Sequence, residues 1–309
     1  MLQVFLSRDG RLEEMTNFAA GSWIALTKPS EEELERVEKE LGVLPHFLRA
    51  ALDSEESPRI DREDGQVLII VDVPIRSSDN QQFYITVPIG IIMLKQHIIT
   101  VCLTDDTIAE SFKDGKVKNF YTQFKTRFIL QLLYRNAYQY LNDLKVLDKM
   151  SSRLEKTLHD SLRNRELLEM LKIEKSLVYF STSLRANETV LERLMRQDII
   201  KNYPEDKDFL DDVIIENKQA IEMCNVYVTI LTSTMDAYAS VISNNQNNVM
   251  KILTSVTLVM AVPTIVSGYF GMNVPVPMTL DSDAFWLIIA GTVLFMLLIT
   301  YILHRIRML

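Results

Sequence analysis

Two long apolar runs dominate the pattern of hydrophobic and polar positions, and both lie near the C-terminal end of the sequence. Residues 252–270 and 284–303 contain no charged side chain. Each run has the roughly 20 residues that a helix needs to cross a hydrocarbon core about 30 Å thick. We therefore expect two transmembrane helices joined by an outer loop at 271–283.

The charges that flank the two runs predict their orientation. Lys251 precedes the first run, whereas His304, Arg305 and Arg307 follow the second in a short basic tail at 304–309. The connecting loop has neither lysine nor arginine. Because these residues favour the cytoplasmic side, and because no N-terminal signal peptide is recognisable, we expect a multi-pass protein of the cell membrane with both termini in the cytoplasm.

Residues 1–120 combine strand-like and helical patterns, which predicts a cytosolic α/β domain. The clearest helix begins after Ser30, has Glu33 at the capping-box position and ends at Gly42. Runs rich in Val, Ile and Tyr predict the strands. The expected strands span 3–7, 22–27, 66–73, 82–93 and 97–103, and a second helix spans 45–52.

The helical period takes over from about Ile108, and two amphipathic stretches in residues 121–203 predict an antiparallel pair of long helices. The first buries one face from Phe128 to Leu147. The second is expected to bury Leu167, Leu168, Leu171, Leu177, Phe180, Leu184, Val190 and Leu194.

A stalk helix at 204–251 is expected to continue without a break into the first span. From Phe209 onward the sequence has no proline or glycine until Pro263, so nothing interrupts the helix. The predicted helix has about 65 residues and, at about 1.5 Å per residue, a length near 100 Å.

One row of polar, small or flexible residues follows this helix. It contains Asp236, Ser240, Ser243, Asn247, Met250, Leu253, Thr257, Ala261, Thr264 and Gly268. A spacing of about 3.6 residues keeps the row on one face. Polar groups are costly in lipid, so the row predicts a pore lining, although close helix packing explains its membrane part equally well. One hairpin cannot surround a pore, so we expect a homo-oligomer.

Composition narrows the function classes. The net charge of −8 argues against a nucleic-acid partner and mildly favours a cationic one. Cys102 and Cys224 lie far apart without metal-binding spacing, and no catalytic motif or phosphate-binding loop occurs. We therefore expect neither an enzyme nor an organic cofactor.

The tripeptide Gly271-Met272-Asn273 follows the first run directly. Gly271 is expected to end the helix in the left-handed conformation. Asn273 offers a neutral carbonyl oxygen, and a ring of such oxygens suits the water shell of Mg²⁺, which dehydrates reluctantly.

In this position the sequence resembles the CorA family of magnesium and cobalt transporters, whose signature is (Tyr/Phe)-Gly-Met-Asn. Residues 250–254, Met-Lys-Ile-Leu-Thr, and the Pro263-Thr264 step extend the likeness. It implies a homopentamer with a cytosolic funnel domain, a long stalk and five first spans around the pore. It also implies a filter of Gly271, Met272 and Asn273, with Asn247, Met250, Leu253, Ala261 and Thr264 along the path and Met250 and Leu253 as its constriction.

The resemblance further implies closure by cytosolic Mg²⁺ bound between subunits. Asp212, flanked by Asp208 and Asp211, matches the stalk ligand, and Asp79 is our choice for the funnel-domain partner. Acidic residues near a helix start are also favoured by the helix dipole alone. The outer loop lacks the Met-Pro-Glu that many members carry after the signature, and the C-terminal tail has fewer basic residues than the lysine-rich tail typical of the family.

Two other functions stay open at this point. One is a transporter of Zn²⁺, Co²⁺ or Ni²⁺ with the same fold, although the row has no His or Cys, which such metals favour. The other is a membrane-anchored scaffold or sensor without conduction, which would leave the polar row unexplained.

Overall fold

The structure is a computed structural model, and it describes residues 1–8, 11–104, 107–114, 117, 120–160, 164–196, 204–274, 283–306 and 308. Its contacts divide the chain into two compact units, Met1–Thr234 and Met235–Leu309. The finer boundaries expected at residues 120, 203 and 251 stay predictions.

Seven strands form one mixed sheet in the first unit, in the order β2-β1-β3-β7-β6-β5-β4. Neighbouring strands are antiparallel except for β3 and β7, which are parallel. The strands are β1 (Leu2–Arg8), β2 (Arg11–Met15), β3 (Trp23–Thr27), β4 (Arg59–Glu63), β5 (Gln66–Arg76), β6 (Tyr84–Met93) and β7 (Ile98–Cys102).

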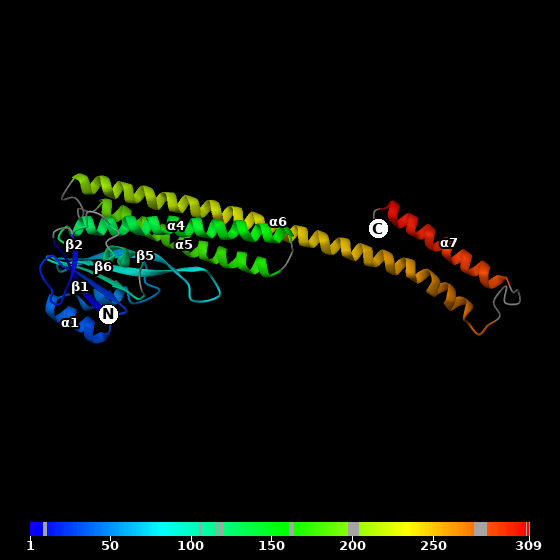
Figure 1. Cartoon of the computed structure of the whole chain (residues 1–309), viewed down its shortest axis with the longest axis horizontal. Coiled ribbons are helices and arrows are strands. Elements are labelled where there is room, and N and C mark those ends of the chain that lie inside the picture. The colour runs from blue at the N-terminus through cyan, green and yellow to red at the C-terminus, as the bar shows by residue number, and fades with distance from the viewer. Residues whose placement is uncertain are drawn as a thin grey trace. The chain divides into compact units, whose positions relative to one another are not determined.

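Helices cover both faces of this sheet, so the unit has three layers (Figure 1). One face packs on α1 (Glu31–Leu41) and α2 (Pro45–Ala50). The other packs on α3 (Thr107–Lys113), α4 (Lys125–Asp160), α5 (Asn164–Arg196) and the first turns of α6 (Pro204–Phe270). The long helices are therefore fixed to a rigid platform with its own apolar core on each side.

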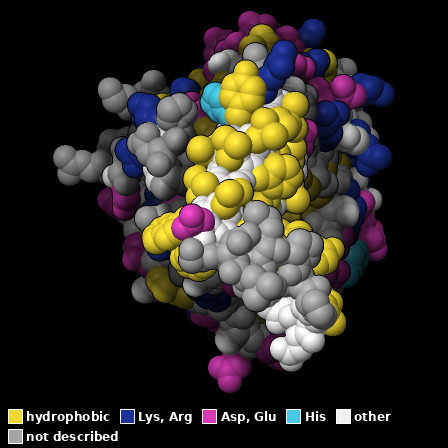
Figure 2. Space-filling model, turned by 90° about the vertical axis from the view of Figure 1, so that its right-hand side faces the viewer, with side chains coloured by type: hydrophobic (Ala, Val, Ile, Leu, Met, Phe, Trp, Pro, Cys, Tyr) yellow, Lys and Arg dark blue, Asp and Glu magenta, His cyan; other side chains and the backbone are white. Residues whose placement is uncertain are grey.

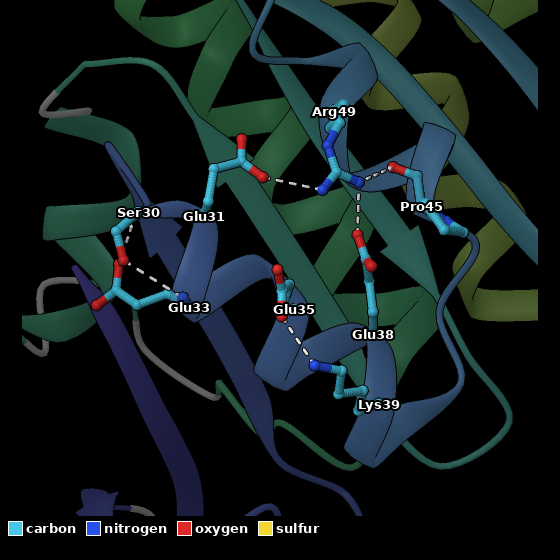
Figure 3. A network of polar contacts seen from close by, with 8 residues as sticks. All are labelled: Ser30, Glu31, Glu33, Glu35, Glu38, Lys39, Pro45 and Arg49. Carbon is cyan, nitrogen blue, oxygen red and sulfur yellow. Dashed lines mark hydrogen bonds and ion pairs between the residues drawn. The ribbon is translucent and has the colours of Figure 1, made fainter.

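The predicted start and end of α1 are confirmed. The amide of Glu33 donates to Ser30 Oγ at 3.3 Å, and the Ser30 amide donates to Glu33 Oε2 at 3.0 Å. Gly42 ends the helix in the left-handed region at φ 65°. Figure 3 also shows Arg49 of α2 bound to carboxylates of α1, which holds the two short helices together.

The strands expected from apolar runs and the change to helix near Ile108 are confirmed, but β2 and β4 were missed. The sequences of β2 and β4 are RLEEM and RIDRE, so charged residues hide the alternation that marks a strand. Both strands lie at the edges of the sheet, where charged side chains discourage pairing with another chain. Their place in the fold therefore explains why their pattern is weak.

The part of β5 that extends past β4 is closed by side chains from α4 and α5. Asp72 lies opposite Pro88 of β6 and beyond the last residue paired with β4. Its amide donates to Asn187 Oδ1 at 2.8 Å, and its carbonyl accepts from Asn136, Asn187 and Tyr140. These contacts satisfy an edge that would otherwise be unpaired.

The expectation for the buried face of α5 is wrong in its first turns. The side chains of Leu168 and Leu171 are 59% and 40% exposed, whereas Met170 and Ile173 are buried. Met170, Ile173 and Leu177 continue the spacing of three and four that leads to Phe180, so they share the face toward the sheet and α4. Leu168 and Leu171 lie on other faces of the helix.

In the second unit, α6 continues unbroken to Phe270, as predicted, and α7 spans Ala284–Arg305. Both helices are long and apolar enough to cross a membrane. Hydrophobic side chains crowd the surface of this unit (Figure 2). Exposed examples are Ile252, Leu253, Val256, Leu258, Ile265, Trp286, Leu287, Leu294 and Leu297. Such a surface fits lipid or other copies of the helix rather than water.

Candidate functional site

The last turns of α6 bury one face within the second unit. Ser255 and Val262 are buried, and Val259 and Val266 are half-buried. Their spacing of four, three and four residues is that of one helix face. Because α7 runs back beside this part of α6 (Figure 1), this face is where the two helices meet.

The row expected to line a pore lies on the opposite side of α6. At about 100° per residue, Leu253, Thr257 and Thr264 lie roughly 150–170° around the helix from the buried face. Leu253 and Met250 are 57% and 58% exposed, and Thr257 and Thr264 are exposed. The second unit therefore leaves the row uncovered, and the row is not part of the contact with α7.

Three more members of the row lie in or next to the span, and two of them are exposed. Asn247 and Gly268 are exposed, and Ala261 is half-buried. A Cβ added at Gly268 would meet no atom within 4 Å. The glycine at this position is therefore not required for contact within one chain.

The hydroxyl groups of the row donate within their own helix. Thr257 Oγ1 donates to the Leu253 carbonyl at 2.8 Å, and Thr264 Oγ1 donates to the Met260 carbonyl at 3.1 Å. Since each hydroxyl hydrogen is used, what remains on each oxygen is its capacity to accept. The exposed face thus presents hydrogen-bond acceptors, which match the outward-pointing hydrogens of a hydrated cation.

Gly271 follows the last residue of α6, but the expected left-handed conformation is wrong. The glycines with positive φ in the described chain are Gly21, Gly42 and Gly65. The amide of Gly271 donates to the Ser267 carbonyl at 2.8 Å, and a Cβ there would lie 3.0 Å from that oxygen. Glycine is therefore favoured here because the backbone approaches the last turn closely.

Met272 and Asn273 are exposed beyond the end of α6. The Met272 side chain is 53% exposed. The residues of the outer loop from 275 to 282 lie outside the described part of the chain. A single chain thus leaves the Asn273 amide open to a ligand or to another copy.

The acidic residues at the start of α6 differ in their surroundings. Asp208 and Asp212 are exposed and Asp211 is half-buried, whereas Asp206 is buried and pairs with Arg127 at 3.3 Å. Asp206 was not singled out from the sequence, and this ion pair anchors the helix start to α4. The outward-facing carboxylates are the ones available to a cation.

The structure does not bring Asp79 and Asp212 together within one chain. Asp79 lines a cavity of about 330 Å³ beside Val146 of α4. Burial raises the pKa of the Tyr134 hydroxyl, and the carboxylates of Glu216 and Asp212 raise it further, so Asp212 lies near Tyr134. Tyr134 and Val146 are about 18 Å apart along α4 at about 1.5 Å per residue.

Among the described residues, no three His, Cys, Asp or Glu side chains of one chain are grouped to hold a metal ion. A site made of Asp79, Asp208, Asp211 and Asp212 would therefore require contributions from two chains. Its composition stays a prediction.

Ser255 is a site residue that the sequence analysis missed. It is fully buried, and its hydroxyl donates to the Met308 carbonyl at 3.1 Å. A polar residue in an apolar span needs a protein partner wherever it faces. The sequence does show a polar residue at 255 within an apolar run. Ser255 lies outside the row, however, and its partner could not be identified without the fold.

Comparison with known proteins gives a consistent result. The family model described as CorA-like Mg²⁺ transporter protein matches residues 18–305. The cobalt/magnesium transport protein CorA of Methanocaldococcus jannaschii is 31% identical over 294 residues, which cover 92% of this chain and 90% of that protein.

Solved structures with the same fold include full-length proteins. The complete structure of the CorA magnesium transporter from M. jannaschii matches with a TM-score of 0.85 and 26% identity, over 99% of this chain and 98% of the other. The full-length CmaX protein matches with a TM-score of 0.73 and 13% identity, over 98% and 97% of the two chains. At that identity the second match speaks for the fold alone.

Proposed function

The chain belongs to the family of CorA-like Mg²⁺ transporter proteins, and from this membership we propose that it carries Mg²⁺, and also Co²⁺, across a membrane. The observation that carries the proposal is the row on α6, whose acceptor oxygens lie opposite the face that meets α7. It supports a pathway between copies of α6 rather than between α6 and α7 of one chain.

In this mechanism Mg²⁺ passes as a hydrated ion. The ion holds its water strongly, so the pathway supplies acceptors for the water hydrogens rather than direct ligands. Asn273 forms the outer ring with Gly271 and Met272, and the hydroxyl oxygens of Thr264 and Thr257 continue the path inward. A ring of neutral amides attracts the hydrated ion without holding it as tightly as carboxylates would.

Several copies of the chain surround the pathway. We propose a homopentamer, the assembly that the family resemblance implies, in which the exposed row of each α6 faces the centre. Met250 and Leu253 then form an apolar ring that stops ions when it is narrow, because a dry constriction does not conduct a hydrated cation. Asn247 lies on the cytoplasmic side of that ring.

The flanking charges favour one orientation in the membrane. Lys251, His304 and Arg305 lie at the same end of the two spans, and by the preference of Lys and Arg for the cytoplasm this end is inside. Both termini are then cytoplasmic, and Asn273 faces outward in the cell membrane.

Intracellular Mg²⁺ is the proposed regulator. Asp212, with Asp208 and Asp211 beside it, faces solvent in one chain, so a cation held jointly with Asp79 of a neighbouring copy would neutralise two acidic surfaces. Loss of this cation leaves like charges facing each other, which drives the copies apart. Because α6 is one continuous helix, such a displacement at its start is passed to its other end.

The test is ²⁸Mg²⁺ or dye-reported Mg²⁺ uptake into liposomes that contain the purified protein. Asn273→Ala should reduce uptake at least tenfold. Asn248→Ala, an exposed asparagine of α6 outside the row, should leave it within twofold. Equal uptake in all three proteins would overturn the filter assignment.

Two further outcomes separate the other functions. Uptake of Zn²⁺ in preference to Mg²⁺ would favour a zinc transporter of the same fold. No uptake of any divalent cation at low internal Mg²⁺ would favour a membrane-anchored scaffold or sensor.

A further inference from the structure

We propose that Ser255 is a positioning residue that ties the C-terminal tail to the back of the pore helix and thereby opposes widening of the constriction. The predicted effect on opening rests on the proposed function, because it assumes that Met250 and Leu253 narrow the pathway. The docking of the tail itself is independent of transport.

The contact is specific to one hydroxyl group. Ser255 has no exposed surface, and its Oγ donates to the carbonyl of Met308 at 3.1 Å. By contrast, the hydroxyls of Thr257, Thr264 and Ser267 donate to carbonyls four residues earlier in α6. Ser255 therefore joins α6 to a segment more than 50 residues away in the sequence.

The tail is shaped to make this contact. Met308 lies against the last turn of α7, where its amide donates to the carbonyl of Leu303 at 3.0 Å. Leu303 is buried. The bond to Leu303 thus holds Met308 where its carbonyl accepts from Ser255.

The contact lies on the side of α6 that is opposite the row. At about 100° per residue, Leu253 and Thr257 each lie about 160° from Ser255. If the row faces the centre of the assembly, Ser255 and the tail lie behind it. Outward movement of the turn that carries Leu253 would displace Ser255 from the Met308 carbonyl and break the bond, so the bond is made in the closed state and opposes opening.

A buried neutral hydrogen bond changes an equilibrium constant by about fivefold. Loss of the contact should therefore shift the closed–open balance by about this factor toward open. In the transport assay, the internal Mg²⁺ concentration that halves uptake should rise about fivefold.

Two different changes remove the same bond. Ser255→Ala removes the donor, and a stop codon after Arg307 removes the acceptor carbonyl of Met308. Each should raise the half-inhibiting Mg²⁺ concentration about fivefold, and the double variant should show no further rise, since the bond can be lost only once. Ser267→Ala, which removes a hydroxyl bonded within α6, should leave this concentration unchanged.

The proposal is overturned if the two effects add, if only one of the changes has an effect, or if neither does. If the changes act by loosening the membrane unit in general, Ser267→Ala should also raise the half-inhibiting Mg²⁺ concentration, and all variants should lower the thermal stability of the oligomer. That result would also overturn the proposal.

A cross-linking experiment separates this inference from the proposed function. In the variant with Ser255→Cys and Met308→Cys, oxidation should join the two thiols within one chain, giving a monomer-sized band with protected thiols. Cys102 and Cys224 are buried, and the protein that carries only these two cysteines gives the background level of cross-linking. Absence of the cross-link in a protein that still takes up Mg²⁺ overturns the docked tail and leaves the transport function standing. A cross-link in a protein that conducts no ion overturns both the transport function and the control assigned to Ser255.

Discussion

Replacing Asn187 with alanine should destabilise the first unit more than any other single loss of an asparagine from its core. Asn187 of α5 is 3% exposed and makes two hydrogen bonds to Asp72 of β5, each 2.8 Å long. Its Oδ1 accepts from the Asp72 amide, which points away from β6 at the open edge of the sheet.

The magnitude follows from what each group of Asp72 retains. The amide loses its acceptor inside the protein, which costs about 1–3 kcal/mol. The carbonyl loses one donor but keeps Asn136 and Tyr140, so that loss costs about 1 kcal/mol or less. A total of roughly 1–4 kcal/mol lowers the melting temperature of a unit of this size by roughly 2–16 °C.

Asn136→Ala is the matched control. Asn136 is 4% exposed and donates to the same carbonyl at 2.8 Å, but it does not contact the amide. Among the described residues its own Oδ1 is buried without a hydrogen-bond partner, so its removal also relieves a cost. We expect a decrease of roughly 2–4 °C.

The assay is thermal unfolding of the full-length protein in detergent, followed by circular dichroism with all variants scanned at one rate. A decrease for Asn136→Ala equal to or larger than that for Asn187→Ala would refute the reasoning, because the amide of Asp72 would then not be the costly group.

Three further predictions concern other parts of the chain. Gly271→Ala places a Cβ 3.0 Å from the Ser267 carbonyl and should reduce Mg²⁺ uptake several-fold, whereas Gly291→Ala in α7, outside the row and with no atom within 4 Å of the added Cβ, should not; equal uptake by the two variants would contradict this. Ser30→Ala removes the cap of α1 and should cost about 1 kcal/mol, seen as a melting temperature lower by roughly 2–4 °C. Burial raises the pKa of Asp143 above its ordinary value, so the folded state binds this proton more tightly than the unfolded state and the wild type loses stability as the pH rises through the folded pKa. Asp143→Asn should therefore be more stable than the wild type at neutral pH, with a gain that vanishes near the ordinary pKa of aspartate; a gain that does not depend on pH would argue against this cause.

Much of the fold could be predicted from local patterns because the forces that set it are local. The 19 and 20 apolar residues of the two runs suffice to span a bilayer, and no proline interrupts the helix before Pro263. Ser30, Glu33 and Gly42 set the ends of α1 through bonds between near neighbours in the chain. The spacing of the row from Asn247 to Gly268 likewise depends only on helix geometry.

What the tertiary structure decided depends on backbone groups whose positions the pattern of side chains does not show. The edge strands β2 and β4 have no apolar alternation of their own, and they form because β1 and β5 offer unpaired backbone groups. The reason for glycine at 271 is the nearby carbonyl of Ser267 rather than a left-handed turn.

The two faces of α6 mark the same division. Sequence periodicity alone separated a polar row from its apolar neighbours, because every residue of a helix has a fixed angle about the axis. The tertiary structure showed that the row lies on the exposed face of α6, because the opposite face is buried. On that opposite face Ser255 donates to the carbonyl of Met308. A hydrogen bond between residues 255 and 308 has no trace in local sequence, since it forms only after α7 has folded back along α6.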